Sequence, residues 1–175
     1  MKFNTKTIHG GQSPDQAFGS VMPPIYQTST YAQTTPGGHK GYEYSRTHNP
    51  TRHALEKSFA SIENGNYGLA FGSGLAAIDA VIKLLSPGDE VISTNDLYGG
   101  TYRLFTKIYQ RFKIKFHFIG MESTHQLERY INSKTKLIWV ETPTNPMLNI
   151  IDIKAVSKIA KKHNILLSVD NTFAT

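Results

Sequence analysis

Short apolar runs alternate with longer amphipathic segments from Tyr67 to Asp170. We expect the runs to be strands, because they are rich in β-branched and aromatic residues and turn residues bound them. The predicted strands are YGLAF (67–71), EVIST (90–94), KIKFHFI (113–119), KLIWVE (136–141) and ILLSVD (165–170). This alternation is typical of βαβ units and predicts an α/β fold, a parallel sheet with helices on both faces. Ligands bind such sheets at the carboxyl ends of the strands, so site residues are expected just after each run.

Helices are predicted between these strands, with starts at Ser73, Thr101, Ser123 and Asp152. The helix from Ser123 is expected to be short. The first has apolar residues at helical spacing, namely Leu75, Ile78, Ile82 and Leu85. Another helix is expected from about Thr51, with Leu55, Phe59 and Ile62 on one face and a stop at ENGN (63–66). The preceding residues are rich in Gly, Pro, Thr, Tyr and Gln without a regular period, which predicts an extended arm with turns. We therefore predict an arm over residues 1–50 and an α/β domain over residues 51–175.

Composition excludes several classes of protein. The chain has no cysteine, so a disulfide framework and a thiolate metal site are ruled out, and no metal site is predicted. The N-terminus lacks the apolar region of a signal peptide and no apolar run could span a bilayer, so a cytoplasmic protein without membrane contact is expected. The net charge of +6 is spread along the chain among acidic residues, which favours a small anionic ligand over nucleic acid.

The glycine turn GSGLAA (72–77) follows the first predicted strand and opens a helix. Free N–H groups and the helix dipole at such a turn suit a phosphate. The turn also matches the dinucleotide pattern G-x-G-x-x-A, with Asp96 about twenty residues on. A nicotinamide-dependent Rossmann oxidoreductase is therefore an alternative, although it explains neither the aromatic and basic arm nor the residues after the later strands.

Polar or aromatic residues follow the later strands as well. Tyr98 lies in NDLYGGTYR (95–103), ETPTNP (141–146) is a turn with two prolines, and Asp170 ends the last strand before NTF. Each alone has an ordinary explanation, as a packing tyrosine, a proline turn or a capping aspartate. Together, a phosphate turn, an aromatic ring and a buried carboxylate at one sheet edge match the phosphate, ring face and ring nitrogen of pyridoxal phosphate.

The motifs YEYSRTHNPTR, FGSGLAAI, DLYGGTYR, ETPTNP and SVDNTF, in this order, resemble the pyridoxal-phosphate enzymes of cysteine and methionine metabolism, the cystathionine γ-synthase and γ-lyase family. The resemblance covers nearly the whole chain. It implies the large domain of a PLP-dependent transferase (aspartate aminotransferase-like, fold type I), incomplete here, with an extended N-terminal arm. It also implies γ-elimination or γ-replacement on cystathionine, O-acyl-homoserine or cysteine.

The resemblance also assigns roles to residues. Ser73, Gly74 and Leu75 would bind the cofactor phosphate, while Tyr98 would stack on the ring and Asp170 would pair with the ring nitrogen. Tyr98 and Asp170 are the expected catalytic residues. The expected substrate-side residues are Glu141, Asn145 and Arg103.

The arm motif has a role of its own in that family. Tyr44 and Arg46 would bind the cofactor phosphate of the neighbouring subunit, in a homodimer that pairs into a tetramer. Arginine suits this task because its planar guanidinium can bind a phosphate through two parallel hydrogen bonds. His48 receives no catalytic role.

The chain departs from the family pattern by ending at Thr175, before the lysine to which the cofactor is linked. We therefore expect an N-terminal portion that is inactive alone, and a non-catalytic fragment is a further alternative. Gly100 stands where methionine γ-lyases typically have cysteine, which favours cystathionine-processing members over methionine γ-lyase, and O-acetylhomoserine sulfhydrylase is another relative. The sequence does not distinguish synthase from lyase.

Overall fold

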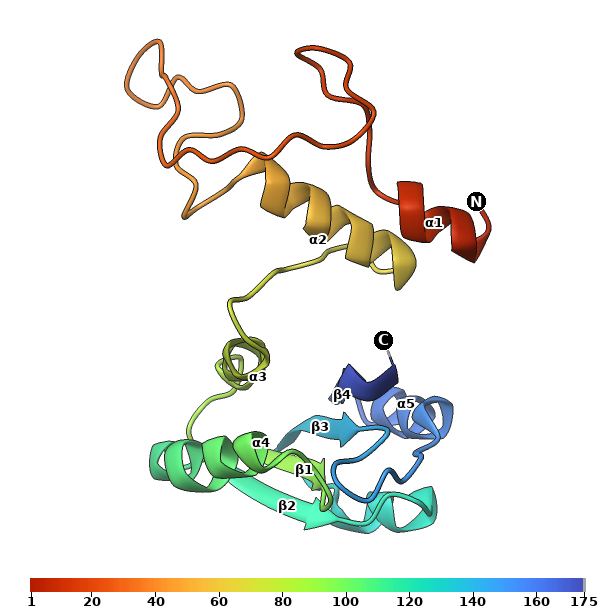
Figure 1. The fold of residues 1–175 in the computed structure, drawn as a ribbon. Helices are drawn as coiled ribbons and strands as arrows, with labels where there is room; N and C mark the ends of the chain where they lie inside the picture. Colours follow the sequence, from red (N-terminus) through yellow and green to blue (C-terminus); the bar gives the residue numbers. More distant parts are fainter. Residues whose placement is uncertain (175) are drawn as a thin grey trace. The chain divides into compact units, whose positions relative to one another are not determined.

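Four parallel strands form the sheet of the second part of the chain (Figure 1). The computed structural model describes residues 1–174 and divides the chain into two compact units, residues 1–72 and the residues from Ser73 onward. The strands are β1 (Glu90–Thr94), β2 (Lys115–Ile119), β3 (Thr135–Glu141) and β4 (Leu166–Asp170). They lie in the order β2-β1-β3-β4, so the strand that comes first in the sequence occupies an inner position. The predicted parallel α/β sheet is confirmed for these four strands.

Side chains alternate between the two faces of this sheet, as the pleat requires. Val91 belongs to one buried cluster and its neighbour Ile92 to the other. The first cluster, on the side of α3 (Gly74–Ile82) and the helical segment after β1, consists of Ile78, Ile82, Val91, Phe105, Tyr109, Ile114, Phe116, Leu137 and Trp139. The second, on the side of α5 (Ile153–Lys162), consists of Ile92, Ile119, Met121, Leu127, Ile138, Val140, Ile151, Val156 and Ala160. Helices therefore cover both faces of the sheet, as predicted.

Two helices of this unit begin where their capping residues predict. Ser73 caps α3 by accepting a hydrogen bond from the Ala76 N–H at 3.2 Å, and Asp152 caps α5 in the same way. The helix expected from Thr101 forms in three parts, α4 (Gly99–Arg103), the π-helical η1 (Leu104–Ile108) and the 3-10 helix η2 (Tyr109–Phe112). The short helix expected at Ser123 is the 3-10 helix η3 (Thr124–Tyr130), and another 3-10 turn, η4 (Thr172–Ala174), follows β4.

The strand predicted at residues 67–71 is wrong, because this segment is not a strand in the structure. A strand needs a neighbour to satisfy its backbone groups, and no described strand pairs with these residues. Tyr67 and Leu69 are largely exposed, and the segment is held by a hydrogen bond from the Ala70 N–H to Oε1 of Glu56 (3.0 Å). The apolar run identified a connecting segment of the first unit, not a sheet strand.

The first unit contains two helices, α1 (Phe3–His9) and α2 (Pro50–Ile62). Helix α2 was predicted, and Asn49 caps it by accepting hydrogen bonds from the first turn. Helix α1 corrects the expectation of an arm without regular structure. It has no buried residue, and Lys6 fastens it by donating from Nζ to the carbonyl oxygen of Ser61 at 3.2 Å. Tertiary contact, not an apolar period, therefore stabilises this short helix.

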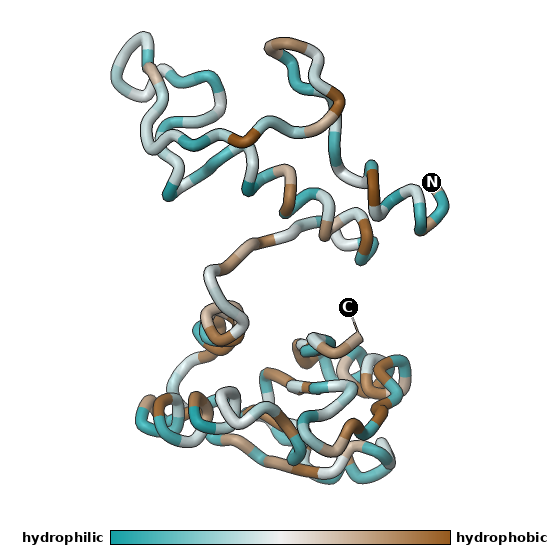
Figure 2. The backbone as a smooth tube through the Cα atoms, in the orientation of Figure 1, coloured by the Kyte–Doolittle hydropathy of each residue, from teal (hydrophilic) through white to brown (hydrophobic). Residues whose placement is uncertain are grey.

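The rest of the first unit is irregular, as expected. A single antiparallel bridge joins Thr30 to Tyr44. Figure 2 shows mostly hydrophilic or neutral backbone through this segment, whereas hydrophobic stretches recur along the strands of the second unit. The predicted division of the chain into an inter-subunit arm (residues 1–50) and an α/β domain (residues 51–175) stays a prediction. No helix in the described part of the chain is long and apolar enough to cross a membrane.

Candidate active site

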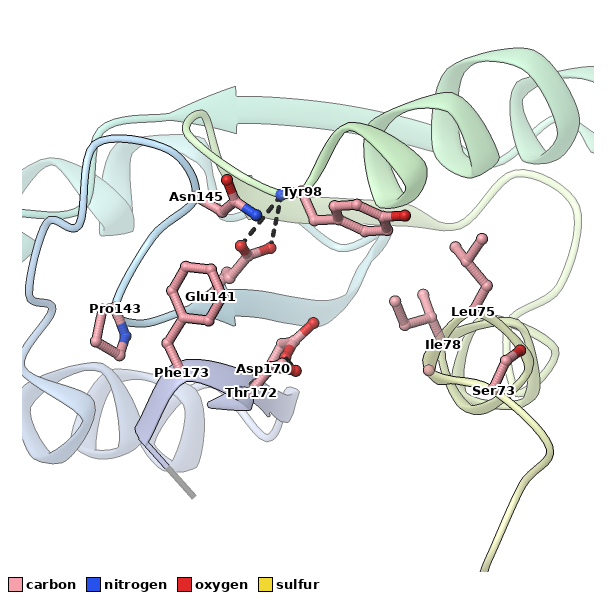
Figure 3. Close-up of a pocket in the computed structure, with 11 residues that line it drawn as sticks. Ser73, Leu75, Ile78, Tyr98, Glu141, Pro143, Asn145, Asp170, Thr172 and Phe173 are labelled. Atoms are coloured by element: carbon pink, nitrogen blue, oxygen red, sulfur yellow. Dashed lines mark hydrogen bonds between the residues drawn. The ribbon is translucent and has the colours of Figure 1, made fainter.

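A cavity of about 370 Å³ opens at the carboxyl end of the sheet (Figure 3). Its walls come from the start of α3 and from the segments that follow β1, β3 and β4, as the rule for parallel sheets predicts. The predicted site residues among its lining are Ser73, Gly74, Leu75, Tyr98, Glu141, Asn145 and Asp170. Residues separated by nearly a hundred positions in the sequence therefore meet in one place.

The start of α3 supplies hydrogen-bond donors to this cavity. The first N–H groups of a helix have no intrahelical acceptor, so the Gly74 and Leu75 amides are available to a ligand. Ser73 uses its Oγ as the acceptor of the helix cap, which leaves its hydroxyl hydrogen free to donate. A Cβ added at Gly74 would meet open space, so nothing in the described residues crowds this end of the cavity. These groups suit an anion.

Tyr98 lies between β1 and α4, and the residue is 46% exposed. Its ring covers Gly100 so closely that a Cβ added at Gly100 would lie 2.3 Å from Cε1 of Tyr98. Leu75 and Ile78 of α3 also line the cavity (Figure 3). The cavity thus has an aromatic ring and aliphatic side chains that suit the faces of a planar ligand.

Glu141 ends β3 and is 5% exposed. Its two carboxylate oxygens accept hydrogen bonds from the Tyr98 backbone N–H at 2.9 and 3.1 Å. Burial raises the pKa of this carboxyl from 4.5 to about 7, although the Tyr98 N–H opposes the rise, and the negative charges of Asp170 and Asp96 add to it. Glu141 is therefore partly protonated near neutral pH.

Asp170 ends β4 directly beside Glu141, because the two residues are partners in the β3–β4 register. The Asp170 carboxylate accepts hydrogen bonds from the Thr172 hydroxyl (2.6 Å) and the Thr172 N–H (3.2 Å), both through Oδ1. It makes no ion pair with any residue that the structure describes. This half-buried carboxylate in the cavity wall suits a cationic group of a ligand.

The turn after β3 is fastened to the segment after β1. Asp96 accepts hydrogen bonds at Oδ2 from the Thr144 hydroxyl (2.5 Å) and from the Met147 N–H (3.0 Å), and Thr144 is buried. These bonds fix the turn that carries Asn145 into the cavity wall. They also give Asp96 a structural role, so the carboxylate that the Rossmann alternative requires for a ribose is engaged elsewhere.

Three predicted residues do not line the cavity. Arg103 lies on α4 with an exposed side chain. Tyr44 and Arg46 belong to the first unit, where the Arg46 guanidinium lies 5.1 Å from the centre of the Tyr44 ring. Arg46 is exposed and has no carboxylate partner in the described part of the chain.

Sequence reasoning also missed four residues of the lining. These are Ile78, Pro143, Thr172 and Phe173. Helical spacing already placed Ile78 on the same helix face as Leu75, and the expected role of Leu75 at the cofactor could have been extended to it. Thr172 and Phe173 follow the end of β4 by two and three positions, so a search for site residues extended by one turn past the strand end could have found them.

An α/β unit with anion donors, an aromatic ring and two adjacent carboxylates at one sheet edge defines a cofactor-binding unit of an enzyme. Comparison with known proteins gives its family. The sequence profile of the family described as "Cys/Met metabolism PLP-dependent enzyme" matches residues 4–175. The chain belongs to this family.

Individual relatives agree. A cystathionine β-lyase of Coxiella burnetii is 48% identical over 173 residues, which cover 98% of this chain and 45% of that protein. A cystathionine γ-lyase of Bacillus subtilis is 51% identical over 175 residues, covering 100% of this chain and 46% of that protein. The crystal structure of a cystathionine γ-lyase from Lactobacillus plantarum, complexed with L-serine, matches with a TM-score of 0.95 and 47% identity over all of this chain and 46% of its own. This chain therefore spans about half the length of these relatives.

The family depends on pyridoxal phosphate, and the donor set of the cavity fits that cofactor. The free amides at the start of α3 suit its phosphate, Tyr98 suits its ring face, and Asp170 suits a protonated ring nitrogen. No lysine is among the described residues that line the cavity.

Proposed function

We propose that the full-length protein is a pyridoxal-phosphate enzyme that cleaves or forms a carbon–sulfur bond of cystathionine, by γ-elimination or by γ-replacement on an O-acyl-homoserine. The observation that carries the proposal is the meeting of Ser73, Tyr98 and Asp170 at one cavity of a chain that belongs to this family. Cystathionine is the substrate named for the relatives described above. O-acetylhomoserine sulfhydrylase and methionine γ-lyase chemistry are the alternatives within the family.

Each wall of the cavity would contribute one function. The Gly74 and Leu75 amides and the Ser73 hydroxyl would anchor the phosphate, and the Tyr98 ring would hold the cofactor ring by stacking. The bound cofactor supplies an electron-withdrawing ring that stabilises negative charge on the substrate Cα. Asp170 would keep the ring nitrogen protonated, because a carboxylate within contact distance of a cation favours the charged form. Asn145 and Glu141 would lie on the side of the cavity where the substrate binds. Arg103 does not line the cavity and stays a candidate for contact with the substrate.

The reaction can be tested on the full-length gene product loaded with pyridoxal phosphate. γ-Elimination converts cystathionine and water into cysteine, 2-oxobutanoate and ammonia, whereas β-elimination yields homocysteine, pyruvate and ammonia. Mass spectrometry of the oxo acid distinguishes the two outcomes, and cysteine with O-acyl-homoserine tests the replacement reaction. A protein that retains bound cofactor but forms neither oxo acid nor cystathionine would contradict the proposal.

Asp170→Asn is the variant that tests the site itself. It preserves shape but removes the charge, so turnover should fall on the order of a hundredfold while the cofactor stays bound. Glu122→Gln, an exposed carboxylate outside the cavity lining, is the control and should leave turnover unchanged. Near-native turnover of Asp170→Asn would remove this residue from the mechanism.

We also propose that Tyr44 and Arg46 act in the cofactor site of a neighbouring subunit. The exposed Arg46 guanidinium, without an ion-pair partner among residues 1–174, supports this role. Arg46→Ala should weaken cofactor binding about ten- to a hundredfold, because it removes charge-assisted hydrogen bonds to the phosphate.

Hybrid oligomers test whether Arg46 acts across the interface. In a dimer of one Arg46→Ala chain and one Asp170→Asn chain, an interface-crossing arm places both lesions in one site and leaves the other site intact. At a cofactor concentration too low to saturate Arg46→Ala, mixing and reassembling the two variants should then restore part of the activity. If mixing restores none, Arg46 acts within its own subunit.

A further inference from the structure

We propose that Glu141 is a positioning residue that holds the Tyr98 ring in place through the Tyr98 backbone, with Gly100 providing the space that the ring needs. This inference rests on the function proposed for the cavity, in which the Tyr98 ring stacks on a planar ligand. It assigns Glu141 a task different from contact with the substrate.

The Tyr98 hydroxyl does not determine where the ring lies. Among the described residues it makes no hydrogen bond, and Tyr98 does not cap α4 with its side chain. The Tyr98 carbonyl oxygen accepts from the Tyr102 N–H (3.1 Å) within the helical segment, so the polar contact that ties Tyr98 to the sheet is its backbone N–H, which both oxygens of Glu141 accept (Figure 3). Moving this amide would move the ring with it.

Glu141 is well placed to act as a fixed anchor. Its side chain is almost fully buried at the end of β3, an inner strand of the sheet. Its own N–H donates to the Thr94 hydroxyl at 3.3 Å, and Asp170 lies beside it in the β4 register. The Glu141 backbone is thus fixed within the sheet between β1 and β4, and its carboxylate holds a residue that precedes a helix of only one or two turns.

Gly100 is the second part of the arrangement. A Cβ at this position would lie 2.3 Å from Cε1, 2.8 Å from Cζ and 3.0 Å from Cδ1 of Tyr98. Separations this short are far inside van der Waals contact, so a side chain at position 100, such as the cysteine typical of methionine γ-lyases, requires a ring position different from the one seen here. The ring position therefore depends on one residue that attracts its backbone and another that leaves room for its side chain.

Hydrogen exchange at the Tyr98 amide, measured on the full-length protein, tests the anchor directly. Glu141→Leu removes both acceptors and should accelerate exchange at this amide about tenfold or more. Glu141→Gln retains one carbonyl acceptor and should keep exchange within about twofold of the native rate. Unchanged exchange in Glu141→Leu would overturn the proposal.

A double-mutant cycle tests whether Glu141 acts through Tyr98. The readout is the dissociation constant of pyridoxal phosphate, measured by fluorescence without any substrate. Glu141→Leu should weaken binding about tenfold in the native background but less than about twofold in a Tyr98→Ala background, because there is then no ring to position. Equal weakening in both backgrounds would show that Glu141 acts independently of Tyr98 and would refute the inference.

Gly100→Ala provides a second route should Glu141→Leu fail to fold. It leaves the Glu141 bond intact, so the Tyr98 amide should stay protected while pyridoxal phosphate binds about tenfold more weakly. Native affinity in this variant would show that the ring position does not matter for binding. If the proposed function is wrong, the native protein will not cleave cystathionine. Hydrogen exchange at the Tyr98 amide would still decide whether Glu141 anchors Tyr98.

Discussion

Replacing Glu141 by glutamine should make the cofactor-free protein more stable at pH 8. The native carboxylate is nearly buried, and burial raises its pKa from 4.5 to about 7. A carboxyl whose pKa is raised on folding binds more protons in the folded than in the unfolded state between these values. The destabilisation is therefore fully present above pH 7, decreases as pH falls from 7 to 4.5, and is absent below pH 4.5.

The size of the effect follows from the same values. Each pH unit between the unfolded and folded pKa corresponds to about 1.36 kcal/mol, so the rise from 4.5 to about 7 costs roughly 3 kcal/mol above pH 7. Glutamine avoids this cost and retains one oxygen to accept from the Tyr98 N–H. Because its amide hydrogens need new partners, we expect a gain of about 1–3 kcal/mol at pH 8.

Urea unfolding followed by circular dichroism, at several pH values and one protein concentration, gives the difference in free energy of unfolding between the two proteins. Other carboxyl groups titrate in both, so the difference isolates position 141. It should be largest at pH 8 and approach zero near pH 4.5. A difference that does not change with pH, or a variant less stable than the native protein at pH 8, would refute the reasoning.

Two further predictions concern carboxylates that stabilise the sheet. Glu90 accepts from Nε2 of His117 (2.6 Å) and Nδ2 of Asn132 (2.9 Å), and these bonds, with Asn132 first, lower its pKa. Its stabilisation is present above pH 4.5 and is lost at lower pH, so Glu90→Gln should cost about 1–3 kcal/mol at pH 7 and progressively less below pH 4.5 in urea unfolding. A cost that persists undiminished at pH 3 would contradict this. Asp96→Ala removes the acceptor of the buried Thr144 hydroxyl and should lower the free energy of unfolding by about 1–3 kcal/mol. Proteases should then cleave the turn after β3 faster than in the native protein. A turn that resists cleavage as well as the native turn would show that Asp96 does not fasten it.

The sequence predicted the sheet well, because the strands that form it combine apolar runs with turn signals. The run at 67–71 has the same composition, yet it is a connecting segment in the first unit. Composition indicates that a segment can be a strand, but pairing depends on a neighbour that the local sequence does not contain. The unpredicted α1 shows the converse, since a contact from Lys6 to Ser61, fifty-five positions away, stabilises a helix without an apolar stripe.

The cavity was predictable for the same reason that the sheet was, since its residues follow strand ends. The bond from Tyr98 to Glu141 was not, because it depends on the strand order. β2 follows β1 in the sequence, but β3 is the other neighbour of β1 in the sheet, and only this order brings residues 98 and 141 together. Periodicity gives the faces of strands and leaves their lateral order undetermined.

The opposite end of the sheet offers a place for a spectroscopic label. The turn before β3 contains Ser133, which is exposed, and the seven residues of β3 separate this edge from the cavity by roughly 23 Å. The 175 residues contain no cysteine, so Ser133→Cys introduces a thiol that is unique within them. A fluorophore attached there would report unfolding of the sheet without touching the cavity, which allows folding and ligand binding to be followed in the same sample.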